Sequence, residues 1–94
     1  MTTKEGLETA LAILQTQGWC KYVMGNADYQ VCALGALRRA YEGHTDKEMA
    51  EARDMLEMCL EAAAEDYSLI SFNDAQDDVE PVYALFREAI RRCS

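Results

Sequence analysis

Two helix start signals of the same form constrain the fold of this chain more than any other feature. Thr2 is followed three residues later by Glu5, and Thr45 by Glu48. In such a capping box the threonine hydroxyl accepts a hydrogen bond from a free amide of the first helical turn, and the glutamate accepts one from the threonine amide. The sequence therefore predicts one helix that starts at Thr2 and ends at Gly18, and another that starts after Thr45.

Apolar residues at helical spacing extend this pattern over most of the chain. Beside the first helix, the predicted helices are 32–43, 46–66, and one that begins at 77 or 78 and carries Pro81 in its first turn. The expected fold class is all-α. We expect a compact four-helix domain with ordered interhelical loops at 18–31 and 67–77, and a single domain over residues 1–94.

The 18–31 connection carries more apolar side chains than a solvated linker needs. They are Trp19, Tyr22, Val23, Tyr29 and Val31. Its glycine, asparagine and aspartate residues favour an ordered loop or a short irregular hairpin. We expect this segment to fold down onto the core.

The net charge of −8 is unevenly distributed, because thirteen of the seventeen acidic residues but only two of the nine bases lie between residues 42 and 80. Nucleic-acid binding proteins need clustered lysine and arginine, so direct binding to nucleic acid is not expected. No apolar run approaches the roughly 18 residues of a membrane span. The predicted location is the cytoplasm, or the host cytoplasm if the protein is encoded by a phage.

Acidic residues occur about once per turn on one face of the predicted 46–66 helix. They are Glu51, Asp54, Glu57, Glu61 and Glu65. Neighbouring carboxylates repel each other, and Arg87, Arg91 and Arg92 of the last helix are candidates to neutralise them. Three interpretations stay open for this face: a solvated surface, a docking surface for a basic host protein, and an imitation of DNA phosphates.

Cys32 is the sharpest candidate for chemistry. A cysteine in the first turn of a helix faces unpaired amides, which favour the thiolate. His44, the only histidine, lies about 18 Å away if the helix between them is continuous, at about 1.5 Å per residue. The candidate catalytic set is therefore Cys32 with Asn73 and Asp74, and the alternative is that Cys32 is a buried core residue.

The other cysteines are expected to be structural. Cys20 and Cys32 flank the same loop, where they could form a reversible disulfide or simply pack, whereas Cys59 and Cys93 fall on apolar stripes. None of the four stands in a Cys-x-x-Cys pair, so no metal and no cofactor are expected.

Asn73 and Asp74 are residue types that cap helices or tie loops through side-chain hydrogen bonds to the backbone. A role in ligand contact is the alternative. Trp19 is expected to anchor the loop in the core, with its indole N–H bonded to a partner such as Asn73 or Asp74.

Three sequence blocks carry a resemblance to a known family. They are Gly18-Trp19-Cys20, Val31-Cys32-Ala33-Leu34-Gly35-Ala36-Leu37 and Ile70-Ser71-Phe72-Asn73-Asp74, followed by an apolar last helix. Over residues 7–92 the chain resembles a domain of unknown function found in small proteins of actinobacteria and their phages. The resemblance implies a small soluble domain of phage or actinobacterial origin, and it implies no reaction.

Two function classes remain. The first is a small acidic accessory protein, encoded by a phage, that binds a host or phage protein. Its candidate binding residues are Trp19, Cys32, Asn73, Asp74, Glu51, Asp54 and Glu61. The alternative is a small-molecule-binding or thiol-dependent enzyme centred on Cys32 with Asn73 and Asp74.

Overall fold

The computed structural model describes residues 1–63 and 68–93 and confirms an all-α fold. Its five helices are α1 (Thr3–Gln17), α2 (Ala33–Ala40), α3 (Asp46–Ala62), α4 (Leu69–Ala75) and α5 (Glu80–Arg92).

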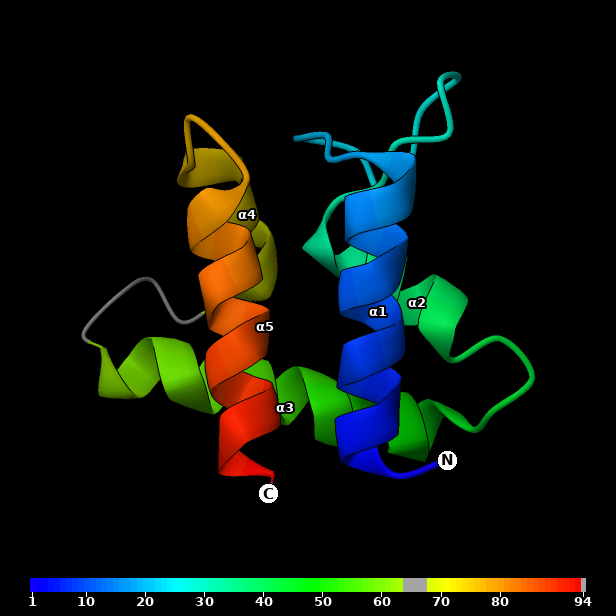
Figure 1. Cartoon of the computed structure of the whole chain (residues 1–94), viewed down its shortest axis with the longest axis vertical. Coiled ribbons are helices and arrows are strands. Elements are labelled where there is room, and N and C mark those ends of the chain that lie inside the picture. Colours follow the sequence, from blue (N-terminus) through cyan, green and yellow to red (C-terminus); the bar gives the residue numbers. More distant parts are fainter. Residues whose placement is uncertain (64–67, 94) are drawn as a thin grey trace.

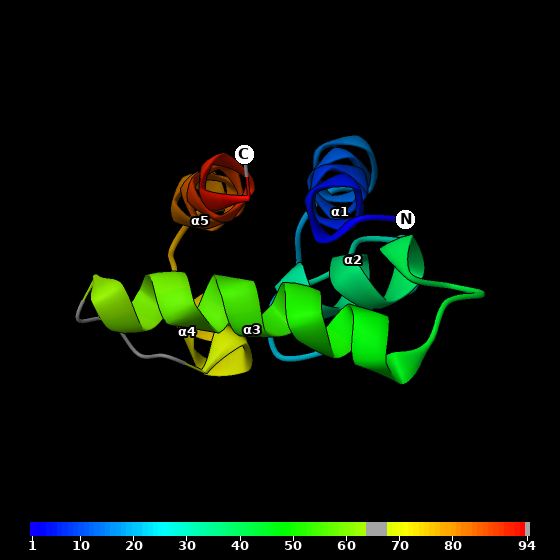
Figure 2. The same cartoon turned by 90° about the horizontal axis from the view of Figure 1, so that it is seen from below.

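The helices form two layers. Figure 1 shows α1 and α5 side by side and running in opposite directions, and Figure 2 shows α2, α3 and α4 in a second layer below them. α3 crosses under both α1 and α5 and contacts each of them. The 18–31 segment and the connection between α4 and α5 lie at the same end of the molecule, at the top of Figure 1.

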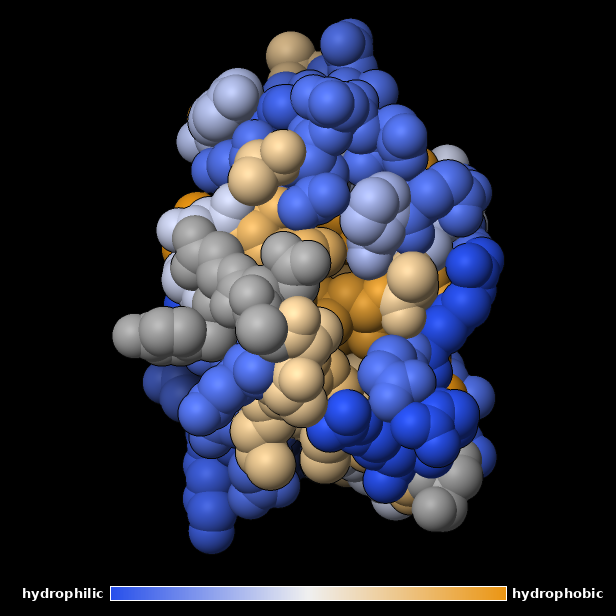
Figure 3. Space-filling model, turned by 90° about the vertical axis from the view of Figure 1, so that its left-hand side faces the viewer, coloured by the Kyte–Doolittle hydropathy of each residue, from blue (hydrophilic) through white to orange (hydrophobic). Residues whose placement is uncertain are grey.

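Most of the core consists of apolar residues at helical spacing, to which Val31 of the 18–31 segment and Leu69 of the expected 67–77 loop are added. The largest fully buried apolar side chains are Leu7, Leu14, Val31, Leu37, Leu56, Leu60, Leu69, Val82 and Phe86. Between α3, α4 and α5 a hollow of about 430 Å³ reaches toward this core. Figure 3, which views the molecule from the side of these helices, shows hydrophobic surface in the middle of that face.

Both predicted capping boxes are present. The hydroxyl of Thr2 accepts the amide of Glu5, and the hydroxyl of Thr45 accepts the amide of Glu48, while each glutamate accepts the amide of its threonine. α1 ends as expected at Gly18, whose φ of 90° is favourable only for glycine. These local signals were sufficient to place two helix starts and one helix end.

Close packing of α1 on α2 depends on Gly6. A Cβ at this position would overlap the phenol group of Tyr41, which is buried against α1 at the C-terminal end of α2. The Tyr41 hydroxyl is buried without a hydrogen-bond partner among the described residues. The two helices therefore approach closely, but at the cost of one unsatisfied polar group.

The expected loop at 67–77 is in part a helix. α4 spans Leu69–Ala75 within it, so that residues 1–63 and 68–93 form five helices where four were expected. Ser68 caps its first turn, and the Leu69 amide donates a 3.0 Å hydrogen bond to Glu57 of α3. The last turn of the predicted 46–66 helix, which includes Glu65, lies outside the described residues.

The expected neutralisation of α3 by the arginines of α5 is not observed among the described ion pairs. Arg91 and Arg92 both bind Glu88 of their own helix, at 2.5 Å and 3.0 Å, and Arg87 lies 4.0 Å from Glu80. Pairs within one helix need less ordering of the chain than pairs between helices, because the partners are already neighbours. No helix of the described residues combines the length and the apolar character needed to cross a membrane.

Candidate functional site

The site forms around Asn73, a buried polar side chain that is 1% exposed. Its Oδ1 accepts two hydrogen bonds, 2.7 Å from Trp19 Nε1 and 3.0 Å from the Ala33 amide. Its Nδ2 donates two, to the Cys20 carbonyl at 3.2 Å and to Asp74 Oδ1 at 3.0 Å. An asparagine side chain offers two donors and one oxygen that accepts two bonds, so all four possibilities are used.

This network joins three segments that are distant in the sequence. Trp19 and Cys20 begin the 18–31 segment, Ala33 is the first residue of α2, and Asn73 lies in α4. The expected bond between the Trp19 indole and Asn73 is confirmed, and Asn73 ties loops together, as the sequence suggested, but does not cap α5. The first turn of α5 is bonded instead by Asp78, whose Oδ1 accepts the Glu80 amide at 2.8 Å.

The 18–31 segment is an irregular hairpin, and we refer to it as the hairpin. Val31 forms isolated bridges to both Trp19 and Gly25. Two further bonds fix the hairpin to α4: the Tyr22 amide donates to Asp74 Oδ1 at 2.8 Å, and Lys21 Nζ donates to the Gln76 carbonyl at 2.7 Å. The base of the hairpin and α4 therefore form one connected unit.

Cys32 performs a structural task at this junction. It is 6% exposed, and its Sγ accepts a 3.3 Å hydrogen bond from the Gly35 amide, so that the thiol caps α2. Gly35 is required at this junction because the hairpin backbone passes directly against it. A Cβ there would overlap the carbonyl oxygen of Met24 in the hairpin, which accepts the Cys32 amide at 3.2 Å.

The four thiols are free in the structure. Burial, with smaller contributions from Cys32 and Asp74 nearby, raises the pKa of the Cys20 thiol, and burial also raises the pKa of Cys59. A higher pKa reduces the thiolate fraction at neutral pH. Among the described residues, no group of three or more histidine, cysteine, aspartate or glutamate side chains is placed to hold a metal ion.

The expectation that the whole hairpin folds onto the core is wrong for three of its five apolar residues. Val31 is buried and Trp19 is half-buried, but Tyr22 is 75% exposed, Tyr29 is 73% exposed and Val23 is also exposed. Both tyrosines have positive φ, 72° and 64°, a conformation unfavourable for bulky residues. Both side chains are exposed in this conformation, so they add little buried apolar surface to the core.

Four exposed apolar side chains gather around the Asp74 carboxylate. They are Tyr22, Val23, Met24 and Ile70, and we call them the apolar rim. Together with Cys32 and Asp74 they line a hollow of about 120 Å³. Ile70 comes from α4 and the others from the hairpin, so the Asn73 network holds the two sides of the rim together.

The acidic candidates lie elsewhere, on α3. Glu51, Asp54 and Glu61 are exposed, and none of them has an ion-pair partner among the described residues. Glu57, on the same helix, is different because it pairs with Arg53 at 3.5 Å and accepts the first amide of α4. The structure thus separates the candidate residues into a network at Trp19, Cys32, Asn73 and Asp74 and a second group on α3.

Sequence reasoning missed the apolar rim and the role of Glu57. Ile70 and Met24 belong to segments of mixed composition, and no sequence pattern shows that they meet. The pairing of Arg53 with Glu57 was visible as an i, i+4 spacing. The second bond of Glu57, which it accepts from the Leu69 amide, depends on how α4 lies against α3, and no local sequence pattern predicts that.

Comparisons with known proteins give a family without an assigned activity. Neither the curated proteins nor the solved structures contain a match to this chain. One family model matches residues 1–92, which is nearly the whole sequence. The chain belongs to this family, which is described as a family of unknown function (DUF6197).

Proposed function

We propose that this protein is a non-enzymatic accessory protein that binds another protein through the apolar rim. The single observation that carries the proposal is the exposure of Tyr22, Val23, Met24 and Ile70 around one hollow. Exposed apolar residues that gather in one place mark interaction surfaces more often than singly scattered ones do. The setting that we propose is the cytoplasm of an actinobacterial host, with the gene carried by a phage, as the sequence resemblance implies.

The size of the hollow favours a protein partner over a small molecule. At about 120 Å³ it is well below the roughly 300–1,000 Å³ of typical small-molecule sites. It suits one protruding apolar side chain. The surrounding tyrosine and methionine are also residue types that are enriched in protein interfaces.

Acidic side chains near the rim indicate that the partner surface is basic. Asp74 Oδ1 is occupied by the Tyr22 amide and Asn73, but no described group bonds its Oδ2. Asp77 and Asp78 follow α4 and are exposed. The partner that fits is therefore a basic protein surface that inserts an apolar side chain between the hairpin and α4 and places a lysine or arginine against Asp74.

The acidic face of α3 has a supporting role in this proposal. Glu51, Asp54 and Glu61 add to the negative field of a protein with a net charge of −8. Such a field accelerates the approach of a basic partner more than it strengthens the final complex. Reversal of these three charges is expected to lower the association rate and its dependence on salt, with a smaller change in the dissociation rate.

The thiol-dependent alternative rests on Cys32, Asn73 and Asp74. The sulfur of Cys32 is buried and engaged with Gly35, and the amide of Asn73 has no free donor or acceptor. This arrangement favours the binding hypothesis, and the thiol hypothesis stays a prediction that the alkylation experiment in the Discussion tests.

Comparative affinity capture tests the proposal. We suggest using the wild type, the Tyr22→Ser/Ile70→Ser rim variant and a Met58→Ser control as baits. Met58 is 57% exposed on α3 and does not belong to the rim. The expected result is a basic protein that the wild type and the control retain and the rim variant loses.

The binding must then be reproduced with the purified partner. Each rim substitution is expected to weaken it by about 1–2 kcal/mol, or roughly 5- to 30-fold in Kd. The proposal is overturned if no purified protein binds saturably, or if the rim variant binds as well as the control. It is also overturned if sedimentation shows that the rim pairs two copies of this chain.

A further inference from the structure

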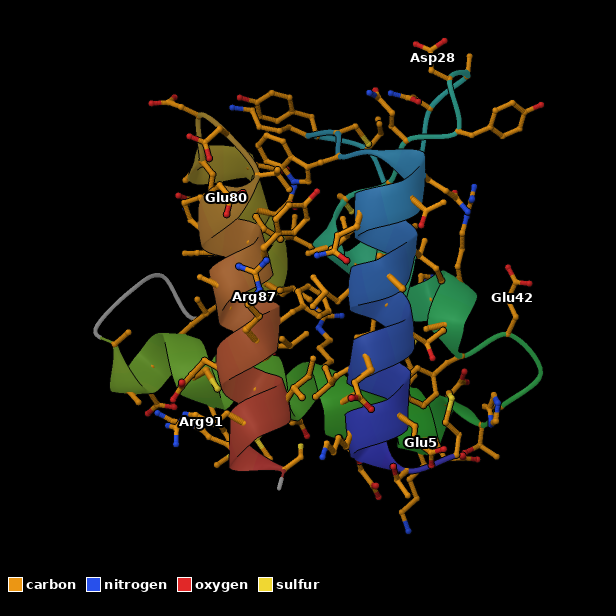
Figure 4. The ribbon with its side chains drawn as sticks, viewed as in Figure 1. Glu5, Asp28, Glu42, Glu80, Arg87 and Arg91 are labelled. Atoms are coloured by element: carbon orange, nitrogen blue, oxygen red, sulfur yellow. The ribbon has the colours of Figure 1, made fainter. Side chains whose placement is uncertain are left out.

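A second hollow, of about 410 Å³, lies on the other side of the hairpin, between its backbone and α2. Its walls are Met24, Gly25, Gly35, Arg38, Arg39 and Glu42. Figure 4 shows Glu42 beyond the end of α2, below the hairpin tip at Asp28. Unlike the hollow at the rim, this one falls within the size range of small-molecule sites. We call it the basic hollow.

The two arginines of the basic hollow differ from the others in the chain. Arg53, Arg87, Arg91 and Arg92 each have a carboxylate within 4.0 Å. In the described part of the chain, neither Arg38 nor Arg39 has an ion-pair partner. A protein with seventeen acidic residues thus leaves the guanidinium groups of two consecutive residues without an ion pair at one hollow.

Arg39 is also held in position by a neutral group. Its Nη1 donates to Gln17 Oε1 of α1, and its Nη2 lies 4.0 Å from the place where a Cβ on Gly25 would stand. The glutamine fixes the guanidinium without cancelling its charge. The missing side chain at Gly25 leaves open the space beside it.

We propose that the basic hollow binds a small molecule that carries an oxyanion group and a hydroxyl group. Arg38 and Arg39 donate to the oxyanion, because guanidinium groups match the geometry of phosphate and carboxylate oxygens. The carboxylate of Glu42 repels a second anionic group but accepts a hydrogen bond from a hydroxyl. The hollow exceeds what a single inorganic ion needs, so the ligand includes a short polar carbon skeleton.

Titration by two-dimensional NMR tests this site with two matched probes, glycerol 3-phosphate and glycerate. They share a three-carbon hydroxylated skeleton and differ in the oxyanion, and ionic strength is held constant because salt screens exposed charges. We expect the amide signals of Gly25 and Gly35 to shift saturably at millimolar concentrations. If only one probe shifts these signals, the site selects phosphate or carboxylate accordingly. If both probes shift them, the site accepts either group.

Variants separate this site from general charge effects. Arg38→Ala and Arg39→Ala are each expected to weaken binding about tenfold or more. Gly25→Asp is expected to abolish it by placing a carboxylate beside Arg39, whereas Arg87→Ala removes an equal charge from α5 and is expected to bind like the wild type.

The inference does not depend on the function of the rim, so the Tyr22→Ser/Ile70→Ser variant is expected to keep full affinity for the probes. The proposal is overturned if neither probe gives a saturable shift. It is equally overturned if Arg38→Ala and Arg39→Ala bind as tightly as Arg87→Ala.

Discussion

Trp19 Nε1 lies 2.7 Å from Asn73 Oδ1, and this bond joins the first residue after α1 and its glycine cap to a buried side chain 54 positions later. The same oxygen accepts the first amide of α2. One asparagine thereby fixes where the hairpin begins, where α2 begins and where α4 lies.

Replacement of Asn73 with alanine is expected to destabilise the fold by about 2–4 kcal/mol, because it leaves the Ala33 amide and the Cys20 carbonyl without their partner. Urea unfolding monitored by Trp19 fluorescence and by circular dichroism measures this loss. Asp28→Ala is the control, since Asp28 is exposed at the hairpin tip and should change stability by less than about 0.5 kcal/mol. Equal stability of the two variants would contradict the role of Asn73.

Alkylation of the thiols at neutral pH distinguishes the structural role of Cys32 from a catalytic one. Cys32 is buried and bonded to Gly35, so it should react only as fast as the protein opens, whereas the half-buried Cys93 should react first. Iodoacetamide labelling followed by peptide mass spectrometry gives the order. Selective labelling of Cys32 in the folded protein would instead favour the thiol-dependent hypothesis.

Tyr41→Phe is expected to raise the free energy of unfolding by up to about 1 kcal/mol, because it removes a buried hydroxyl that has no described partner. Thermal unfolding measures the change. Tyr29→Phe serves as the matched control, since that hydroxyl is on an exposed side chain. A clear loss of stability in Tyr41→Phe would show that the hydroxyl has a hydrogen-bond partner in solution.

The pKa of the Glu88 carboxyl is expected to lie well below the ordinary value of a glutamate. Hydrogen bonds from Arg91 and Arg92 lower the pKa of its carboxyl to about 2. A carboxyl with a lowered pKa in the folded state contributes stability above its ordinary pKa, and this contribution is lost as the pH falls toward 2. Carbon-detected NMR titration measures the pKa, and replacement of both arginines with alanine should return it to the ordinary range.

The elements that the sequence predicted correctly all have local causes. The capping boxes at Thr2 and Thr45, the stop at Gly18 and the placing of Pro81 in the first turn of the last helix depend on residues within one turn. α4 has only seven residues, and part of its start is supported by Glu57, twelve positions earlier. A helix this short is stabilised by its surroundings and leaves little periodic pattern.

The candidate site was predictable only at its centre. Trp19, Asn73 and Asp74 are residue types that require hydrogen-bond partners, so their meeting followed from chemistry. The rim did not follow, because Tyr22, Val23, Met24 and Ile70 are apolar residues whose usual place is the core. Tyr22 has a left-handed backbone conformation and an exposed side chain, and no pattern in the sequence predicts either.

The saturation of Asn73 has a consequence for how this domain could change over evolution. Since the base of the hairpin is secured by bonds to the Cys20 carbonyl and the Ala33 and Tyr22 amides, these particular bonds are indifferent to the side chains further out. Relatives could exchange their outward residues and acquire new specificities while the scaffold keeps its shape. The base of the hairpin is thus the part that holds the fold, and its outer residues are the part that is free to vary.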